Sequence, residues 1–176
     1  MNKSDEFDPD LLIDRLAGYV KIVESIVQCV HSCDAKWKPD ESTWSVLEIV
    51  CHLCDEEVED FRTRVLMTLE QPAEAWPSID PQGWVLERDY SSRDIKVQVD
   101  RFVQLRNDSV EILRALRAPA WSNIHYHPVF GSFQAGQMLA CWVDHDALHL
   151  RQLAKRLHEL AIRDGGNVST EYAGTW

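Results

Sequence analysis

Glycine and proline are scarce in this chain, with seven of each among 176 residues. An architecture of many short strands needs many turns, and turns depend on both residues. The low counts therefore disfavour an all-β fold. Hydrophobic residues make up 45% of the sequence, which is enough for one compact domain with a full-sized core.

Basic residues are also in short supply. The 18 lysines and arginines are outnumbered by 29 acidic residues, and the formal net charge is −11. Such a chain cannot neutralise a run of phosphates, so nucleic acid is not an expected partner. The longest apolar runs are much shorter than a membrane span, and the charged N-terminus lacks the apolar core of a signal peptide. We therefore expect no membrane partner.

Cysteine occurs in an odd number, which leaves at least one thiol unpaired. Each of the five lies in a segment with helical patterning. This usage is typical of a reduced protein, so we predict a cytoplasmic location. The five residues are Cys29, Cys33, Cys51, Cys54 and Cys141.

Four segments have apolar residues at the i, i+3, i+4 spacing of an amphipathic helix. They span about residues 9–30, 45–69, 92–116 and 132–160. Four such helices in a chain of this size predict an all-α four-helix bundle. We place this single domain at residues 1–163 and treat residues 164–176, which show no periodicity, as a C-terminal tail.

The second helix has a clear start signal. Ser45 and Glu48 form a capping-box pattern, and Trp44 stands where a hydrophobic staple residue would lie. These residues predict that the helix begins at Ser45.

The connection between the second and third helices is long and rich in breakers. Residues 70–90 contain Pro72, Pro77, Pro81 and Gly83, so they are predicted to be irregular. About 20 extended residues reach roughly 66 Å, whereas a helix of 25 residues is roughly 37 Å long. The connection can therefore run the length of the bundle and place these two helices parallel, although its length does not require this.

Three histidines are the main functional candidates. His145 and His149 are four residues apart in the last helix, so their imidazoles lie on one face. His52 lies in the second helix, just outside its apolar arc. Two imidazoles from one helix and a third from its neighbour can bind a divalent metal ion and leave positions open for water or substrate. Spacing alone also permits partly buried, backbone-bonded imidazoles on the last helix and a solvated His52.

Acidic residues near His52 are candidates for catalysis. Asp55 and Glu56 lie one turn beyond that histidine. A ligating imidazole usually gives its second N–H to a carboxylate or a carbonyl group. We predict that Asp55 and Glu56 orient the ligands or act as a general base, although a solvated acid on a helix face is an equal alternative.

Residues beside the histidine pair are candidates for cofactor binding. Met138 and Trp142 align with His145 and His149 on the last helix and would make one side of the site partly apolar. A soft thiolate can bind a borderline-soft metal ion in such a setting.

Two arginines in the same helix, Arg151 and Arg156, are the nearby basic residues that could hold an anionic cofactor. We predict cofactor contacts for Arg151 and Trp142.

Other patterns are weaker. The segment from His145 to His149 has the two histidines of a metalloprotease motif, but that chemistry uses Glu as its base, and this chain has Asp. Cys51 and Cys54 form one C-x-x-C pair in mid-helix, which fits neither a two-pair zinc site nor an activated thiol. The chain has no Glu-x-x-His pair for a di-iron centre. The segment 125–127, His-Tyr-His, is predicted to lie in a loop that could border a pocket.

Two longer motifs resemble those of the DinB-like (DinB/YfiT) superfamily of metal-binding four-helix-bundle proteins. Residues 44–53 read WSVLEIVCHL and are similar to the W-S-x-x-E-x-x-x-H-L start of the second helix in that family. Residues 145–153 read HDALHLRQL and resemble its H-D-x-x-H-x-x-Q-L signature. Residues 130–132, Phe-Gly-Ser, match the glycine turn before the last helix. The resemblance covers the whole chain.

This resemblance implies an up-down-down-up topology, a homodimer and one divalent metal ion bound by His52, His145 and His149. Characterised members include transferases and isomerases that use bacillithiol, mycothiol or glutathione, whose thiol pKa is lowered by the metal. The resemblance therefore implies a small-molecule substrate and a low-molecular-weight thiol cofactor. Three imidazoles suit several metals. We expect Zn or Ni first, with Fe, Co and Mn as alternatives.

Three functional hypotheses remain open from the sequence. The first is a metal-dependent enzyme, either a thiol S-transferase or a related hydrolase. The second is a non-catalytic metal- or ligand-binding protein of a stress response. The third is a structural bundle whose histidines bind no metal. The first two share the metal and differ in whether a substrate is turned over.

Overall fold

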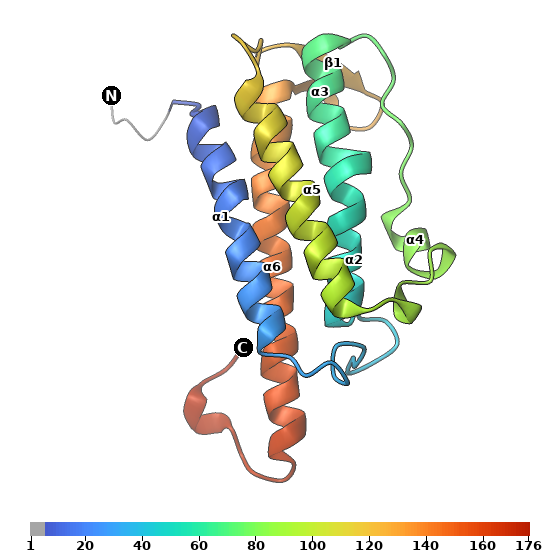
Figure 1. The fold of residues 1–176 in the computed structure, drawn as a ribbon, viewed down its shortest axis with the longest axis vertical. Coiled ribbons are helices and arrows are strands. Elements are labelled where there is room, and N and C mark those ends of the chain that lie inside the picture. The colour runs from blue at the N-terminus through green and yellow to red at the C-terminus, as the bar shows by residue number, and fades with distance from the viewer. Residues whose placement is uncertain (1–5) are drawn as a thin grey trace.

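Four long helical units lie side by side along the long axis of the molecule (Figure 1). The computed structural model describes residues 6–176, so the first five residues of the predicted 1–163 domain lie outside the described residues. The units are α1 (Pro9–Gln28); α2 (Val46–Glu56) with its continuation through the π-helix η2 (Glu57–Arg62) into α3 (Thr63–Glu70); α5 (Ile95–Ala115); and α6 (Ala135–Gly165). No helix within residues 6–176 is long and apolar enough to cross a membrane.

The order of directions along the chain is up-down-down-up. In Figure 1, α1 and α6 run one way, while the α2–α3 unit and α5 both run the other way. Residues 71–94 make this possible because they return along the outside of the bundle from the end of α3 to the start of α5 (Figure 1). The structure therefore confirms the predicted bundle, its topology and the parallel second and third units.

The returning connection is more ordered than the sequence predicted. It contains the helix α4 (Pro81–Glu87) and a short 3-10 turn, η3 (Tyr90–Ser92). Asp80 caps α4 by accepting a hydrogen bond from the Gly83 N–H at 3.0 Å, and Pro81 lies in the first turn, where its missing N–H costs nothing. A Cβ at position 83 would collide with the Asp80 carboxylate. Residues expected to break regular structure thus build the start of a helix.

A two-stranded antiparallel hairpin precedes the last helix and was also missed. Its strands are β1 (Ile124–His127) and β2 (Gly131–Gln134), with His125 paired to Phe133. At four residues each, the strands are too short for alternation to be visible in the sequence. Gly131 has φ +74°, a conformation that favours glycine at this turn. The hairpin moves the start of the last helix from the predicted residue 132 to Ala135.

The last helix and the tail also differ from prediction. Helix α6 continues to Gly165, beyond the predicted end near residue 160 and into the predicted tail. Gly166, with φ +58°, ends it. The rest of the tail contains only the 3-10 turn η4 (Glu171–Ala173).

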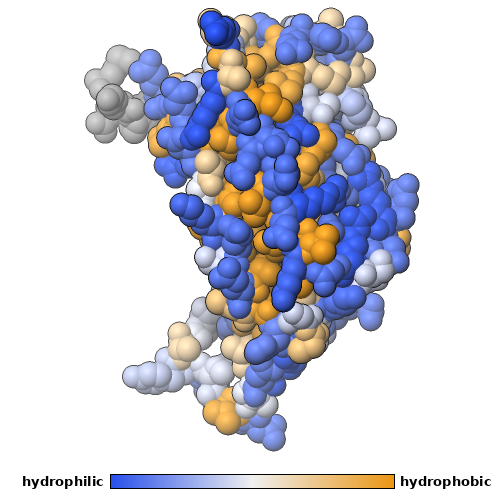
Figure 2. All heavy atoms as spheres, in the orientation of Figure 1, coloured by the Kyte–Doolittle hydropathy of each residue, from blue (hydrophilic) through white to orange (hydrophobic). Residues whose placement is uncertain are grey.

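The core consists of two apolar clusters. One packs the start of α2 against the start of α5 and the second half of α6, around Leu47, Phe102 and Leu153. The other packs η2 and α3 against the first half of α6, around Phe61 and Leu139. The face seen in Figure 2 is mostly hydrophilic, with an apolar band along the seam between α1 and α5. Between the two clusters, at mid-height of the bundle, lies a layer of buried polar residues that forms the candidate site.

Candidate metal centre

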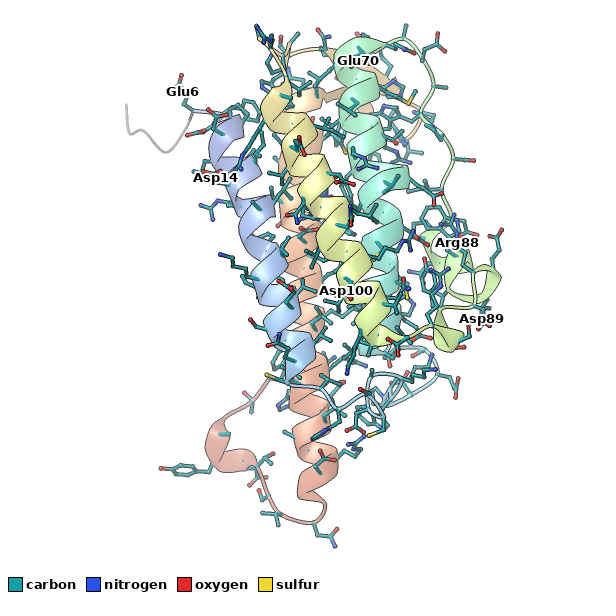
Figure 3. All side chains as sticks on the ribbon, viewed as in Figure 1. Glu6, Asp14, Glu70, Arg88, Asp89 and Asp100 are labelled. Carbon is teal, nitrogen blue, oxygen red and sulfur yellow. The ribbon has the colours of Figure 1, made fainter. Side chains whose placement is uncertain are left out.

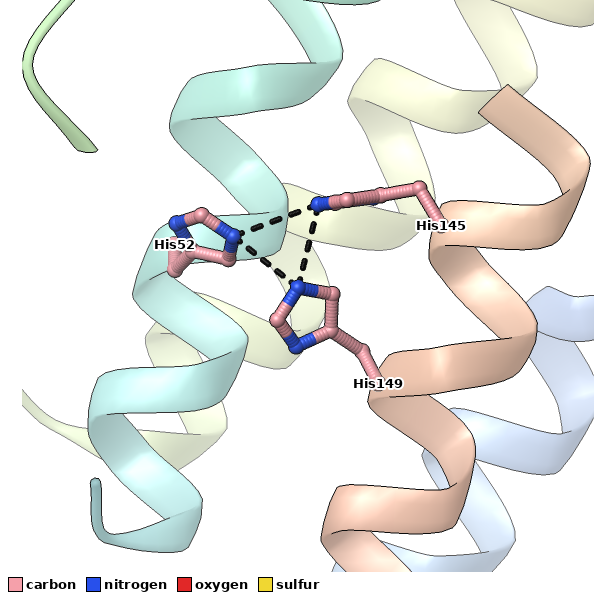
Figure 4. A group of neighbouring side chains, drawn as sticks. All are labelled: His52, His145 and His149. Carbon is pink, nitrogen blue, oxygen red and sulfur yellow. Dashed lines mark hydrogen bonds between the residues drawn. The ribbon is translucent and has the colours of Figure 1, made fainter. Parts of the chain in front are cut away.

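The three predicted histidines converge on one point between α2 and α6 (Figure 4). The Nε2 atom of His149 lies 3.0 Å from those of His52 and His145, and the latter two are 3.3 Å apart. Together they form a set of side chains able to hold a metal ion. The spatial convergence that spacing alone left open is therefore present.

Local structure accounts for this placement. The Ser45 hydroxyl accepts a hydrogen bond from the Glu48 N–H, and the Glu48 carboxylate accepts one from the Ser45 N–H. This capping box starts α2 and thereby sets the direction in which His52 points, seven residues later. On α6, the four-residue spacing of His145 and His149 brings their rings onto one face.

The donor set fits a divalent cation. Nitrogen ligands at about 2.0–2.1 Å from a tetrahedral zinc ion lie roughly 3.3 Å from one another, which is close to the observed spacing. Three nitrogens this close cannot all form hydrogen bonds to one another, because each Nε2 atom is either a donor or an acceptor and cannot be both. A cation at their centre would satisfy all three.

Burial keeps two of the imidazoles neutral. Burial and the neighbouring His145 lower the pKa of His52 and of His149 to about 3. Burial also acts to lower the pKa of His145, but contacts with Asp146 and Glu56 outweigh it and raise that pKa to about 9. His52 and His149 therefore offer lone pairs at neutral pH, while a metal ion would have to displace a proton from His145.

Glu56 is an acidic residue that reaches the Nε2 atoms of the histidines. Its Oε2 atom lies 2.9 Å from His145 Nε2 and 3.7 Å from His52 Nε2. The carboxylate is buried, with 5% of the residue exposed. Glu56 therefore lies beside the histidine nitrogens, and its catalytic role stays a prediction.

Asp55 does not face the histidines. One carboxylate oxygen accepts hydrogen bonds from Tyr90 and Arg88 and the other from Arg101. Figure 3 labels Arg88 at the end of α4, beside α2. Burial alone would raise the pKa of Asp55, but Tyr90, Arg88 and Arg101 outweigh it and hold that pKa below its usual range. Asp55 therefore holds the returning connection, through Arg88 and Tyr90, and α5, through Arg101, against α2.

The helix changes form directly after Glu56. Glu57–Arg62 is a π-helix. Directly after it, the Thr63 hydroxyl donates a hydrogen bond to the Val58 carbonyl at 2.6 Å. The wider turn inserts extra backbone into the predicted continuous helix, and Glu57, Asp60 and Phe61 are buried within it. Such π-helical insertions occur frequently at functional sites. A 3.6-residue pattern cannot reveal one, so the sequence prediction missed it.

A buried ion network behind the site was also missed. Arg106, on α5, is fully buried and forms a two-pronged ion pair with Glu57 at 2.6–2.9 Å. It also donates to Asp146 and to the Leu16 carbonyl. The sequence held a signal for it, because Arg106 falls on the apolar stripe of its helix between Phe102 and Val110.

Two further side chains contact the histidines directly. His149 Nδ1 lies 2.8 Å from Gln152 Oε1, so a proton on Nδ1 is donated there and the Nε2 lone pair points inward. The indole ring of Trp44 packs against His52 and His149, with ring centroids 4.7 Å and 6.3 Å away. Gln152 belongs to the H-D-x-x-H-x-x-Q-L signature, whereas the sequence pattern predicts only a staple role for Trp44.

A cavity of about 580 Å³ opens over the three histidines. Its lining presents polar and apolar surface in about equal measure and comprises Ser42, Thr43, Trp44, His52, Glu56, Pro81, Gln82, His145, His149, Gln152, Lys155 and Arg156. The cavity joins the candidate metal position to solvent, so a small molecule could reach it.

The predicted cofactor residues lie at different places around this cavity. Arg156 lines it and donates to Thr43 at 3.0 Å. Arg151 lies in a neighbouring hollow of about 530 Å³ that also includes Trp176. Trp142 is buried behind the site, where its indole N–H donates to Glu57 at 3.3 Å. Trp142 lies three positions before His145 on the same side of α6, but its side chain is buried in the core and does not line the cavity.

The weaker motifs are separate from the centre. Cys51 and Cys54 are buried and unpaired, and burial raises the pKa of Cys51 to about 12. His125, in β1, has its Nδ1 atom 3.1 Å from the Pro72 carbonyl oxygen and stacks on Trp76. Neither group contributes to the histidine cluster.

Comparisons with known proteins agree with this architecture. Residues 22–153 match the family model of the DinB superfamily. The fold is similar to that of YfiT from Bacillus subtilis, described as a probable metal-dependent hydrolase with an unusual four-helix bundle topology, with a TM-score of 0.77, 18% sequence identity and coverage of 92% of this chain and 90% of that one. No functionally curated protein matches the chain in sequence. Because the family model spans most of the chain, this protein belongs to the DinB superfamily.

Proposed function

We propose that this protein is a metal-dependent enzyme that hydrolyses a small molecule in the cavity over His52, His145 and His149. One observation carries the proposal: three imidazole Nε2 atoms meet at the base of an open cavity, with the Glu56 carboxylate beside them. Structural zinc sites are closed by four protein ligands, whereas catalytic sites keep a position open. The similarity to YfiT supports the same class of reaction.

Each residue of the site would have a separate role in the reaction. The three histidines would hold the metal, which when bound supplies a Lewis acid that lowers the pKa of an oxygen or sulfur ligand. Glu56 would take a proton from the attacking water and return it to the leaving group. Gln152 holds the His149 ring in the orientation that presents Nε2. Trp44 packs against the rings of His52 and His149 and would restrict their movement.

The metal itself is tested by elemental analysis of protein purified without a nickel column. We expect about one divalent ion per chain, with Zn or Ni first and Fe, Co or Mn as alternatives. A folded protein that contains no metal and takes none up would leave only the structural hypothesis. Bound metal without turnover of ester, amide or phosphoester substrates would favour the non-catalytic binding protein.

Glu56→Gln should lower turnover by about 10²- to 10⁴-fold, because an amide cannot accept the proton. The metal content should stay unchanged, since the three imidazoles remain. The measurement is kcat together with metal analysis of the same sample. Glu59→Gln is the matched control, because Glu59 lies on the same helical unit but pairs with Arg88 on the surface. Unchanged kcat in Glu56→Gln would remove Glu56 from the mechanism, and loss of metal would make it a ligand.

A second candidate function is thiol S-transfer, favoured by positive charge at the cavity. Lys155 and Arg156 both line it, although the chain as a whole has a net charge of −11. They could hold an anionic low-molecular-weight thiol while its sulfur reaches the metal position. Glu159, which contacts both side chains, offsets part of this charge.

Thiol binding can be followed in cobalt-substituted protein. Bacillithiol, mycothiol or glutathione should change the cobalt spectrum, and Lys155→Gln should weaken this binding by about twofold to fivefold, as expected for a partly exposed charge pair. Lys21→Gln, on the exposed face of α1, serves as the control. If no thiol changes the spectrum, S-transfer should be abandoned in favour of hydrolysis or metal binding alone.

The homodimer and the cytoplasmic location stay predictions. Sedimentation equilibrium of the metal-loaded protein would test the first. Fractionation of cells that produce the protein would test the second.

A further inference from the structure

Three consecutive acidic residues of the α2–η2 unit enter three different environments. Asp55 is held by Arg88, Arg101 and Tyr90. Glu56 faces the histidines, and Glu57 faces Arg106. Only the first of these is explained by packing of the returning connection. The pairing of Glu57 with a fully buried arginine, directly beside the candidate base, needs another explanation.

Arg106 joins every helical unit of the bundle. It projects from α5, which provides none of the candidate ligands. Its Nε and Nη2 atoms donate to the Glu57 carboxylate on η2, and its Nη1 atom donates to Asp146 on α6 and to the Leu16 carbonyl on α1. Neither Arg106 nor Glu57 has exposed side-chain area. The guanidinium therefore fixes the relative positions of the two units that carry the histidines.

On α6, this contact reaches the neighbour of a candidate ligand. One Asp146 oxygen is taken by Arg106, and the other, Oδ1, lies 3.8 Å from His145 Nδ1. Both Asp146 Oδ1 and His145 Nδ1 are buried and have no hydrogen-bond partner. Buried polar atoms without partners are rare. A shift of less than 1 Å would join the two, and a metal ion at Nε2 requires the remaining proton of the ring to be on Nδ1.

On η2, the same guanidinium holds the start of the π-helical turn. Glu57 is its first residue and directly follows Glu56. Trp142 adds a further hydrogen bond to Glu57, at 3.3 Å. With Glu57 fixed from two sides, the backbone that presents Glu56 to His145 cannot rotate.

We propose that Arg106 is the positioning residue of the metal centre: through Asp146 it orients His145, and through Glu57 it fixes the turn that presents Glu56. The inference rests on the proposed function, since it assumes that the histidines bind a metal. Fold stability alone does not account for such a network, because buried ion pairs are often replaced by apolar residues without loss of stability.

The test compares zinc affinity in Arg106→Lys and Asp146→Asn with the wild type, using a competing chromophoric chelator. Lysine keeps the charge but cannot bridge both carboxylates, and asparagine removes the acceptor strength of Asp146. Both variants should bind zinc about 10- to 100-fold more weakly, the range found when groups that orient a ligand are changed. Arg101→Lys and Tyr90→Phe are matched controls, because they alter the network around Asp55, which contacts no histidine. Both controls should bind zinc like the wild type.

A second measurement separates positioning from stability. In the zinc-loaded protein, imidazole ¹⁵N spectra should show the His145 Nδ1 signal shifted in both variants, while His149, whose Nδ1 faces Gln152, keeps its signal. If Arg106→Lys fails to fold, Asp146→Asn carries the test. Lower unfolding free energy with wild-type zinc affinity and an unchanged His145 signal would overturn the proposal. Failure of the wild type to bind zinc would instead overturn the proposed function and this inference with it.

Discussion

Replacing His149 with alanine should reduce the affinity for zinc by about two to three orders of magnitude. Structural zinc sites with four ligands bind with about 10–16 kcal/mol, so one ligand contributes roughly 2.5–4 kcal/mol. A tenfold change in Kd corresponds to about 1.4 kcal/mol. The fold should survive, because His149 is only partly buried and packs mainly on Trp44 and the other two histidines. Competition with a chelator measures the loss, and circular dichroism checks the fold.

His158→Ala is the matched control for that experiment. His158 lies on the same helix but stacks on Trp176, away from the histidine cluster. Its removal should leave the zinc affinity at the wild-type value. Equal zinc affinity in the His149 variant and the wild type would show that the three imidazoles are not the binding site, however closely they approach one another.

The bundle itself could be predicted because its signals are local and repeated. Apolar spacing marks four helical segments, and the capping box at Ser45 marks the start of one to the residue. The parallel arrangement of α2–α3 with α5 was permitted by the length of the connection and implied by the family resemblance. Helix α4 was missed because Pro81 and Gly83, which usually interrupt helices, here occupy positions at a helix start that accept them.

The three histidines could be predicted from the sequence, but the different roles of Asp55 and Glu56 could not. A regular helix leaves Asp55 and Glu56 as equal candidates one turn beyond His52. The environments are set by residues distant in sequence, because Arg88 and Arg101 donate to Asp55 and Arg106 donates to Glu57, which leaves Glu56 facing the histidines. Local sequence patterns reveal neither the arginine partners of these acids nor the change from α-helix to π-helix.

Arg106→Met should lower the free energy of unfolding of the metal-free protein by about 3–5 kcal/mol. The substitution leaves the buried carboxylates of Glu57 and Asp146 without their cation, and breaking a buried pair from one side has a cost of this size. Methionine fills much of the space, so the loss reflects uncompensated charge more than a cavity. Urea unfolding followed by circular dichroism measures it.

Arg114→Met provides the contrast that makes this result interpretable. Arg114 also pairs with a carboxylate, Asp14, but both side chains are more than half exposed. An exposed pair contributes only about 0–1 kcal/mol, because water already solvates both charges and salt screens them. The same substitution on the same helix should thus be several-fold less costly at position 114 than at 106. Equal losses at the two positions would mean that water reaches the ion pairs of Arg106 with Glu57 and Asp146. Arg106 could then not hold these two residues in fixed positions beside the histidines.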